Sequence, residues 1–148
     1  MKLLKHALAT TAAVVIGGTM FAGVPANAAG SNCDGTQVKT CMNVRISGGK
    51  ATPAARITDM PDGVDFQVKT THVVLQRQSS NGTWTNATAV VKDFDGWHDR
   101  EDLALGKAVP CKPGHPVKVR AKARFDWKRI GSDHEWAYSK PVNLICAN

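Results

Sequence analysis

The chain has 148 residues, of which 21% are charged, and 19 lysines and arginines against 12 acidic residues give a formal net charge of +7. This length leaves room for one domain with a modest core once a leader is removed. No segment after residue 24 is apolar for long enough to cross a bilayer, which excludes an integral membrane domain there. A mild basic excess favours anionic partners or serves ordinary solubility, and charge alone does not choose between them.

The first 28 residues have the order of a secretory signal peptide. Lys2 and Lys5 form a basic start, residues 7–24 are an apolar run, and Ala-Asn-Ala follows at residues 26–28. This order predicts cleavage after Ala28 and a secreted, extracellular domain at residues 29–148. A retained anchor is the alternative, and the shortness and the glycines of the run weigh against it. Loss of the two lysines would lower the net charge from +7 to +5.

The cysteines predict a disulfide framework. All of them lie after the leader, at Cys33, Cys41, Cys111 and Cys146. An even count in an exported chain indicates two disulfides, for which three pairings exist. We expect Cys33–Cys41 and Cys111–Cys146, since each bond would join neighbouring segments. Zinc binding by these cysteines is not expected, because the spacings lack close Cys or His pairs.

The first half of the expected mature domain begins with a loose segment at residues 29–32. Apolar residues then alternate with polar ones over residues 42–47, which predicts a short strand with one buried face. Residues 48–53 are expected to break this strand. Residues 60–63 (Met-Pro-Asp-Gly) predict a turn, because Pro presets φ and Gly accepts a positive φ.

The next segment predicts a strand with a change of phase, followed by a hairpin. Apolar residues alternate on one parity over residues 64–68 and on the opposite parity over residues 73–77. The change at residues 70–72 indicates a bulge or a corner. Asn81-Gly82 between two β-rich runs predicts a tight hairpin, with Trp84 covering it.

The last third contains the clearest strand. Residues 94–105 fit either one helical turn or a loop that enters a short strand. Residues 117–125 keep a period of two throughout, with apolar residues on one face and cations on the other. A final strand is predicted from about Trp136 to Cys146. Short strands closed by Gly, Pro or Asn-Gly, with few helix candidates, predict an all-β antiparallel β-sandwich.

Three stretches resemble parts of a fibronectin type III or immunoglobulin-like domain. Residues 113–123 (PGHPVKVRAKA) resemble a late strand and the turn before it, and residues 138–142 (YSKPV) resemble the edge strand. Residues 75–84 resemble the middle hairpin. The leader resembles those of secreted actinobacterial proteins. The resemblance covers about the last 75 residues and implies an immunoglobulin/fibronectin-III-like sandwich with a binding or spacer role.

The chain departs from that family in three places. The tryptophan of an early strand is missing, and Val117 stands where the family has a tyrosine. The stretch from Asp93 to Val109 does not match the family pattern. The early strands and this connection are therefore the parts for which the resemblance gives no guidance.

The basic stripe of the clearest strand is the main candidate for binding. Its cations recur at alternate positions, about 7 Å apart on one sheet face, at Lys118, Arg120, Lys122 and Arg124. The following segment, residues 125–138, is expected to be an exposed loop that adds common interface anchors, Trp127, Arg129 and Trp136. These residues predict a binding or adaptor module for an extracellular protein or an anionic surface polymer, as in an accessory subunit of an exported assembly. The alternative is a solvated face that discourages edge pairing.

Other chemistry is weakly signalled. Asp93, Asp95 and Asp99, with Glu101 and Asp102, resemble a fragment of a calcium loop, and an acidic surface loop is the alternative. The mature histidines lack metal-ligand spacing, at His72, His98, His115 and His134. We therefore predict no metal site and no cofactor. No nucleophile elbow or phosphate-binding glycine loop occurs, so we expect neither an enzyme nor specific nucleic acid recognition.

A second hypothesis of a different class is an inhibitor of an extracellular hydrolase. Small secreted disulfide domains can present a rigid loop to a protease. The segment between Cys33 and Cys41 is the candidate loop, with Lys39 as its specificity residue.

Overall fold

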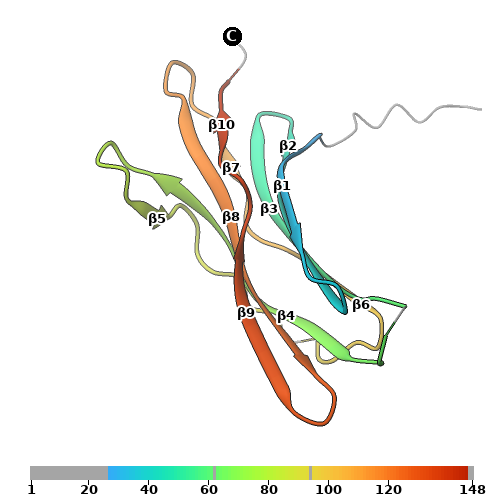
Figure 1. Cartoon of the computed structure of the whole chain (residues 1–148). Helices are drawn as coiled ribbons and strands as arrows, with labels where there is room; N and C mark the ends of the chain where they lie inside the picture. Colours follow the sequence, from blue (N-terminus) through green and yellow to red (C-terminus); the bar gives the residue numbers. More distant parts are fainter. Residues whose placement is uncertain (1–26, 62, 94, 147–148) are drawn as a thin grey trace, which may run out of the picture.

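The computed structural model describes residues 27–61, 63–93 and 95–146, and strands are the regular structure in these ranges (Figure 1). The strands are β1 (Asn27–Asp34), β2 (Val38–Ser47), β3 (Lys50–Asp59), β4 (Gln67–Gln78), β5 (Trp84–Asn86), β6 (Glu101–Leu105), β7 (Val109–Pro110), β8 (Val117–Lys128), β9 (Ser132–Tyr138) and β10 (Val142–Leu144). The predicted leader lies outside the described residues, apart from Asn27 and Ala28 at the start of β1.

These strands form two antiparallel sheets. The first has the order β1-β2-β3-β6, with β7 also paired to β3, and the second has the order β10-β8-β4-β5, with β9 also paired to β8. Both sheets contribute to one apolar core, whose largest buried side chains include Phe125, Met42, Ile57 and Leu75. The predicted all-β fold with two antiparallel sheets is confirmed, and its arrangement is sandwich-like.

Strand β8 is the central strand of the second sheet. Val119, Ala121, Ala123 and Phe125 are buried, while the residues between them point outward, as the period of two predicts. The strand continues beyond the predicted end at Phe125 as far as Lys128. It pairs with β4 on one side and with β9 and β10 on the other, so it fixes the outer face of this sheet.

The predicted change of phase in β4 is confirmed as a bulge. Thr70 pairs with Phe125 and His72 pairs with Arg124, which leaves Thr71 as the extra residue. A bulge residue shifts the alternation by one position, so buried positions occur at Val68 before it and at Val73 after it. Both halves of β4 therefore face the core.

The predicted Asn81-Gly82 hairpin is also confirmed. Gln78 pairs with Trp84 across it, and Gly82 has a φ of 85°. Of the two alternatives for residues 94–105, the loop entering a short strand is correct, because β6 occupies Glu101–Leu105. Phe94 itself lies outside the described residues.

The predicted break after Ser47 is confirmed at its start, but it is shorter than the predicted residues 48–53. Gly48 and Gly49, with φ of 55° and 68°, form a tight turn, and β3 then runs for ten residues. Pro53 is tolerated in β3 because it lies between the stretches that pair with β7 and with β6. The Pro53 carbonyl accepts a hydrogen bond from the Gly106 amide, on the side of β3 that faces β6 and β7. No backbone N–H of residue 53 is needed for strand pairing on that side.

The predicted loose start at residues 29–32 is wrong, because these residues belong to β1. The strand pairs with β2 and also contacts the second sheet. The Lys140 amide donates to the Gly30 carbonyl at 2.8 Å, and the Asn32 amide group donates to the Tyr138 carbonyl at 3.0 Å. Gly30 has a φ of 64°, and a Cβ there would lie 2.2 Å from the Lys140 oxygen. Only glycine fits this approach, and β1 thereby bridges the two sheets along one side.

The exposed loop predicted at residues 125–138 is instead a hairpin of β8 and β9, which extends beyond the rest of the second sheet (Figure 1). The single final strand predicted from Trp136 to Cys146 is divided into β9 and β10. Between them, the Ser139 hydroxyl accepts a hydrogen bond from the Ala121 amide at 2.9 Å. This side chain replaces a strand partner, so β8 stays hydrogen-bonded where its edge is interrupted.

Both predicted disulfides are present. Cys33–Cys41 joins directly paired residues of β1 and β2. Cys111–Cys146 connects the segment after β7, in the first sheet, to the segment after β10, in the second. Two disulfides indicate an oxidising, extracellular compartment. Among the residues described, no helix has the length and apolar character needed to span a membrane.

Candidate functional site

The outer face of the second sheet gathers most of the aromatic residues outside the core. Three of the four tryptophans and the single tyrosine lie there, each with a cation over its ring. We call this surface the cation–aromatic face and define it by the rings of Trp84, Trp97, Trp136 and Tyr138 and by the cations Lys69, Lys118, Arg120, Lys122, Arg124 and Lys128. Strand order brings these residues together from β4, β5, β8, β9 and the β5–β6 connection.

Arg120 is held between two rings. Its guanidinium carbon lies 4.4 Å from the centre of the Trp84 ring and 4.3 Å from that of Tyr138. Its Nε donates a hydrogen bond to Oε1 of Gln76 at 3.0 Å. Burial lowers the pKa of Arg120 from its ordinary value, although arginine remains charged in proteins. The packing fixes the position of this cation and leaves it without an anionic partner among the described residues.

Lys122 continues the array toward Trp136. Its Nζ lies 4.4 Å from the centre of the Trp136 ring and 5.7 Å from that of Tyr138. Trp136 is 43% exposed and packs against His72 with ring centres 5.6 Å apart. Burial, followed by the charges of Lys92 and Arg124, lowers the pKa of His72. The exposed part of Trp136 therefore offers an apolar surface bordered by cations.

The two ends of the predicted stripe differ. Lys118 is exposed, opposite Asn143 of β10. Arg124 is half-buried and forms an ion pair with Asp126, with Nη2 3.0 Å from Oδ1. The stripe thus contains one solvated cation, two that pack on rings and one that is neutralised by a neighbour.

Trp97, from the β5–β6 connection, forms a second aromatic–cation group. The ammonium groups of Lys69 and Lys128 lie 4.3 Å and 4.4 Å from the centre of its ring. Between this group and His72 lies a cleft of about 370 Å³. The lining combines cations, carboxylates and rings from Lys69, Thr71, His72, Asp93, Gly96, Trp97, Arg124 and Asp126.

The structure places the predicted site residues in two groups. Arg120, Lys122, Arg124 and Trp136 lie together on the cation–aromatic face, and Lys118 lies at its end. Trp127 instead has the inward parity of β8 and packs, partly buried, against the core. Arg129 lies in the β8–β9 turn, where it is exposed. The prediction that Trp127 and Trp136 lie together in one exposed loop is therefore wrong.

The residues missing from the predicted site are Trp84, Trp97, Tyr138, Lys69 and Lys128. Each comes from another segment, and only the strand order and the path of the β5–β6 connection bring it to the stripe. The available signal was the alternation of side chains along β4 and β9. It tells on which face of the sheet a side chain lies, but not which side chain of the adjacent strand lies next to it.

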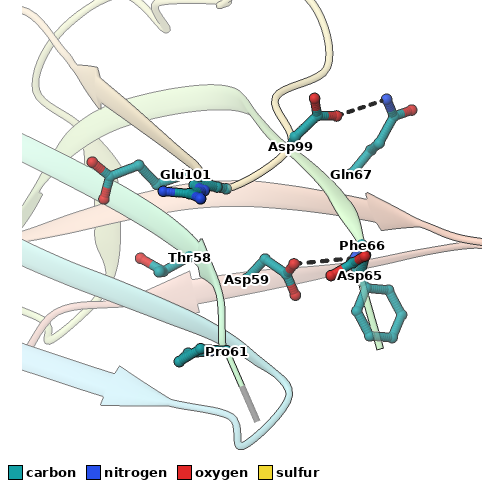
Figure 2. Close-up of a pocket in the computed structure, with 9 residues that line it drawn as sticks. Thr58, Asp59, Pro61, Asp65, Phe66, Gln67, Asp99 and Glu101 are labelled. Atoms are coloured by element: carbon teal, nitrogen blue, oxygen red, sulfur yellow. Dashed lines mark hydrogen bonds between the residues drawn. The ribbon is translucent and has the colours of Figure 1, made fainter. Parts of the chain in front are cut away.

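A wider cleft of about 970 Å³ lies where β3 ends and β4 and β6 begin (Figure 2). The charged residues of its lining are mainly acidic, with Asp59, Asp65, Asp99 and Glu101 beside a single cation, Arg100. Three of the carboxylates are used locally: Asp59 accepts from the Phe66 amide at 3.2 Å, Asp99 accepts from the Gln67 side chain at 3.1 Å, and Glu101 forms an ion pair with Arg56. The labelled carboxylates spread along the cleft in Figure 2 and do not converge on one point.

A third group of polar residues lies in and after the β5–β6 connection. Asp95, His98 and Asp102 each present one ligand-type atom, and these atoms lie within 4.8 Å of one another. The Asp95 carboxylate raises the pKa of His98, and His98 in turn lowers the pKa of Asp95. The pKa of Asp93, beside them, is raised first by burial. Of the five acidic residues in the calcium-loop fragment, only Asp95 and Asp102 belong to this group, together with an imidazole that the fragment did not include.

Lys39, the residue of the inhibitor hypothesis, is exposed but lies within β2, paired with Thr58 of β3. It is not at the tip of the segment that the Cys33–Cys41 bond closes. The inhibitor hypothesis therefore stays a prediction, with no observation in its favour. In comparisons with known proteins, no family model matches the chain, and no curated protein matches it.

Proposed function

We propose that the chain is a secreted binding module of the immunoglobulin/fibronectin-III-like class. The strand order supports this class: β2, β3 and β6 face a second sheet that contains β5, β4, β8 and the divided β9–β10 edge. In immunoglobulin-like sandwiches the chain likewise crosses between the two sheets as successive strands are formed. Strand β1 would be an additional edge strand of the first sheet. The expected signal peptide and the two disulfides support secretion.

We further propose that the cation–aromatic face binds an anionic surface polymer. The observation that carries the proposal is the sequence of alternating rings and cations from Trp84 through Arg120, Tyr138 and Lys122 to Trp136. Cations about 7 Å apart match a repeating polyanion, and exposed ring faces can stack on its uncharged parts. Packing on rings removes much of the entropy that free lysines and arginines lose on binding.

Of the two partners predicted from the sequence, this arrangement favours the polymer over a protein. Protein interfaces usually have an apolar centre with charges at the rim, and here cations run through the centre. We propose a binding role and not an enzyme. The groups of this face hold and neutralise a ligand, and none of them is a nucleophile with an adjacent base.

The test is binding to poly(glycerol phosphate), with heparin as a second polyanion and dextran as a neutral control. We expect binding to both polyanions, weakening as salt rises, and none to dextran. The double variant Lys118→Ala/Lys122→Ala should bind at least tenfold more weakly. The matched control is Lys39→Ala/Lys50→Ala, which removes the same charge from exposed positions of the first sheet. An equal loss in both variants, or salt-independent binding, would contradict the proposal.

A further inference from the structure

The Asp95, His98 and Asp102 group is a second candidate site, separate from the cation–aromatic face. Nε2 of His98 lies 3.0 Å from Oδ1 of Asp95 and 3.9 Å from Oδ1 of Asp102. Metal–ligand bonds of about 2.0–2.1 Å in a tetrahedral site place neighbouring ligand atoms about 3.3 Å apart. The two observed separations lie on either side of this value.

Two of the three side chains are held in position by the fold. The backbone of His98 forms a two-way bridge with Val68, with hydrogen bonds of 2.9 Å and 3.0 Å. Oδ2 of Asp102 accepts a hydrogen bond from the Thr70 amide, beside the β4 bulge, at 2.6 Å. The side chain of Asp95 is 55% exposed, so it is the least confined of the three.

One nitrogen that faces the centre of this group lacks a hydrogen bond. Nε2 of His98 is buried without a hydrogen-bond partner, although Oδ1 of Asp95 lies 3.0 Å away. The side chain of Asp102 is 3% exposed, and its Oδ1 lies 3.9 Å from the same nitrogen while its Oδ2 accepts the Thr70 bond. A buried nitrogen left in this way is costly unless something binds it.

The surrounding charges do not neutralise the group. In a chain with 19 lysines and arginines, none of the described ones forms an ion pair with Asp95 or Asp102. The carboxylate of Asp93 adds to the negative charge nearby. A bound cation would neutralise this charge and give Nε2 of His98 the partner that it lacks.

We propose that Asp95, His98 and Asp102 bind one divalent transition-metal ion, with zinc as the preferred ion. One imidazole nitrogen and two carboxylate oxygens form a donor set that suits zinc, whereas calcium requires six to eight oxygens. Three protein ligands leave a coordination position for water or for an anionic group of a ligand. The proposal replaces the calcium interpretation of this segment and does not depend on the function proposed for the sheet face.

Metal binding would also position one wall of the neighbouring cleft. Trp97 lies between Asp95 and His98 in the chain, lines the cleft, and has the ammonium groups of Lys69 and Lys128 against its ring. A metal that fixes residues 95 and 98 would therefore fix Trp97 as well.

The experiment measures Zn²⁺ and Ca²⁺ binding to the tag-free secreted protein by calorimetry, together with the melting temperature and the Co²⁺ absorption spectrum. We expect one Zn²⁺ per chain, a higher melting temperature that a chelator reverses, and a Co²⁺ spectrum of low coordination number. Ca²⁺ at the same concentration should have no effect. Absence of Zn²⁺ binding by the folded wild-type protein would overturn the proposal.

Variants locate the ion. His98→Gln and Asp95→Asn should each weaken Zn²⁺ binding at least tenfold, while Asp99→Asn, in the same segment but hydrogen-bonded to Gln67, should retain it. Asp95→Asn alters an exposed side chain, so it keeps the test valid should His98→Gln fail to fold. Unchanged affinity in Asp95→Asn and His98→Gln, or an equal loss in Asp99→Asn, would reject these ligands. Polyanion binding is measured separately in metal-free buffer, so the two proposals can fail independently.

Discussion

Arg120 illustrates how the cations of β8 differ from an ordinary solvated stripe. Each ring contact contributes about 0.5–1 kcal/mol at a partly exposed site, and Arg120 has two of them. The guanidinium nevertheless keeps its charge. Its side chain is ordered before any ligand arrives, which is the condition under which a surface cation contributes most to binding.

His72 should make the stability of the protein depend on pH. Its Nδ1 is buried without a hydrogen-bond partner, and its ring lies against Trp136. Burial, Lys92 and Arg124 lower its pKa from 6.5, and Asp126 opposes them only in part. Below pH 6.5 the unfolded chain therefore binds more protons than the folded one, and stability falls as the pH falls.

Urea unfolding at pH 8 and pH 5 tests this dependence. We expect the wild-type protein to lose more stability between these pH values than His72→Gln, which cannot take up the proton. The comparison between the two proteins removes the contribution of His98, whose pKa shift has the opposite sign. An equal loss in both proteins would contradict the role of His72.

Part of the candidate site was predictable residue by residue, and part was not. The alternation of residues 117–125 placed Lys118, Arg120, Lys122 and Arg124 on one face, because a strand has a fixed period of two. Their aromatic partners depend on which strands become neighbours, a non-local property that one segment does not contain. Trp127 was misplaced because the strand continues past Phe125. Two residues further along, Trp127 lies on the same inward face as Phe125.

At the level of elements, β1 depends on Gly30. A Cβ at this position would collide with the Lys140 carbonyl, and the positive φ is unfavourable for any other residue. Gly48 also has a positive φ, of 55°, but a Cβ there would have no atom within 4 Å. A substitution at Gly48 therefore measures the cost of the positive φ alone, whereas one at Gly30 also includes the cost of the lost contact between the sheets.

We predict that Gly30→Ala lowers the free energy of unfolding by about 3 kcal/mol or more, and that Gly48→Ala lowers it by about 1–2 kcal/mol. The difference arises because only the first variant must also separate β1 from the β9–β10 connection. Chemical denaturation of both variants measures it. Equal losses would mean that the contact at Gly30 contributes nothing beyond its φ.

The elements that the sequence missed share a physical reason. Strand β3 contains four alanine or proline residues among its first six, and none of these types favours strands. It is held by partners on both sides instead. Strand β9 is mostly polar, and its existence depends on the edge that β8 offers. By contrast, the β4 bulge and the Asn81-Gly82 hairpin were predictable, since their signals are local.

For the whole molecule, the two disulfides should have unequal effects. Cys33–Cys41 closes a loop of sequence separation 8 between strands that are already paired. Cys111–Cys146 has a separation of 35 and connects the two sheets. In the chain-entropy model the first bond stabilises the fold by about 2.5 kcal/mol and the second by about 4 kcal/mol.

We therefore expect Cys111→Ser/Cys146→Ser to lower the free energy of unfolding by more than Cys33→Ser/Cys41→Ser does. Urea unfolding of the oxidised variants gives the two values, and free-thiol titration verifies that the remaining bond is intact. A larger loss from the Cys33–Cys41 pair would show that the smaller loop, and not the connection between the sheets, dominates stability.

The bridge that β1 forms between the sheets also bears on self-association. An unpaired strand edge is a template for adding a strand from another molecule, and this is how β-proteins commonly aggregate. On the bridged side, the backbone groups of Gly30 and Tyr138 are already engaged with partners in the opposite sheet. On the other side, β5 is only three residues long, and the edge shared by β6 and β7 is interrupted at Gly106. At these two edges a second copy therefore finds little continuous backbone on which to dock.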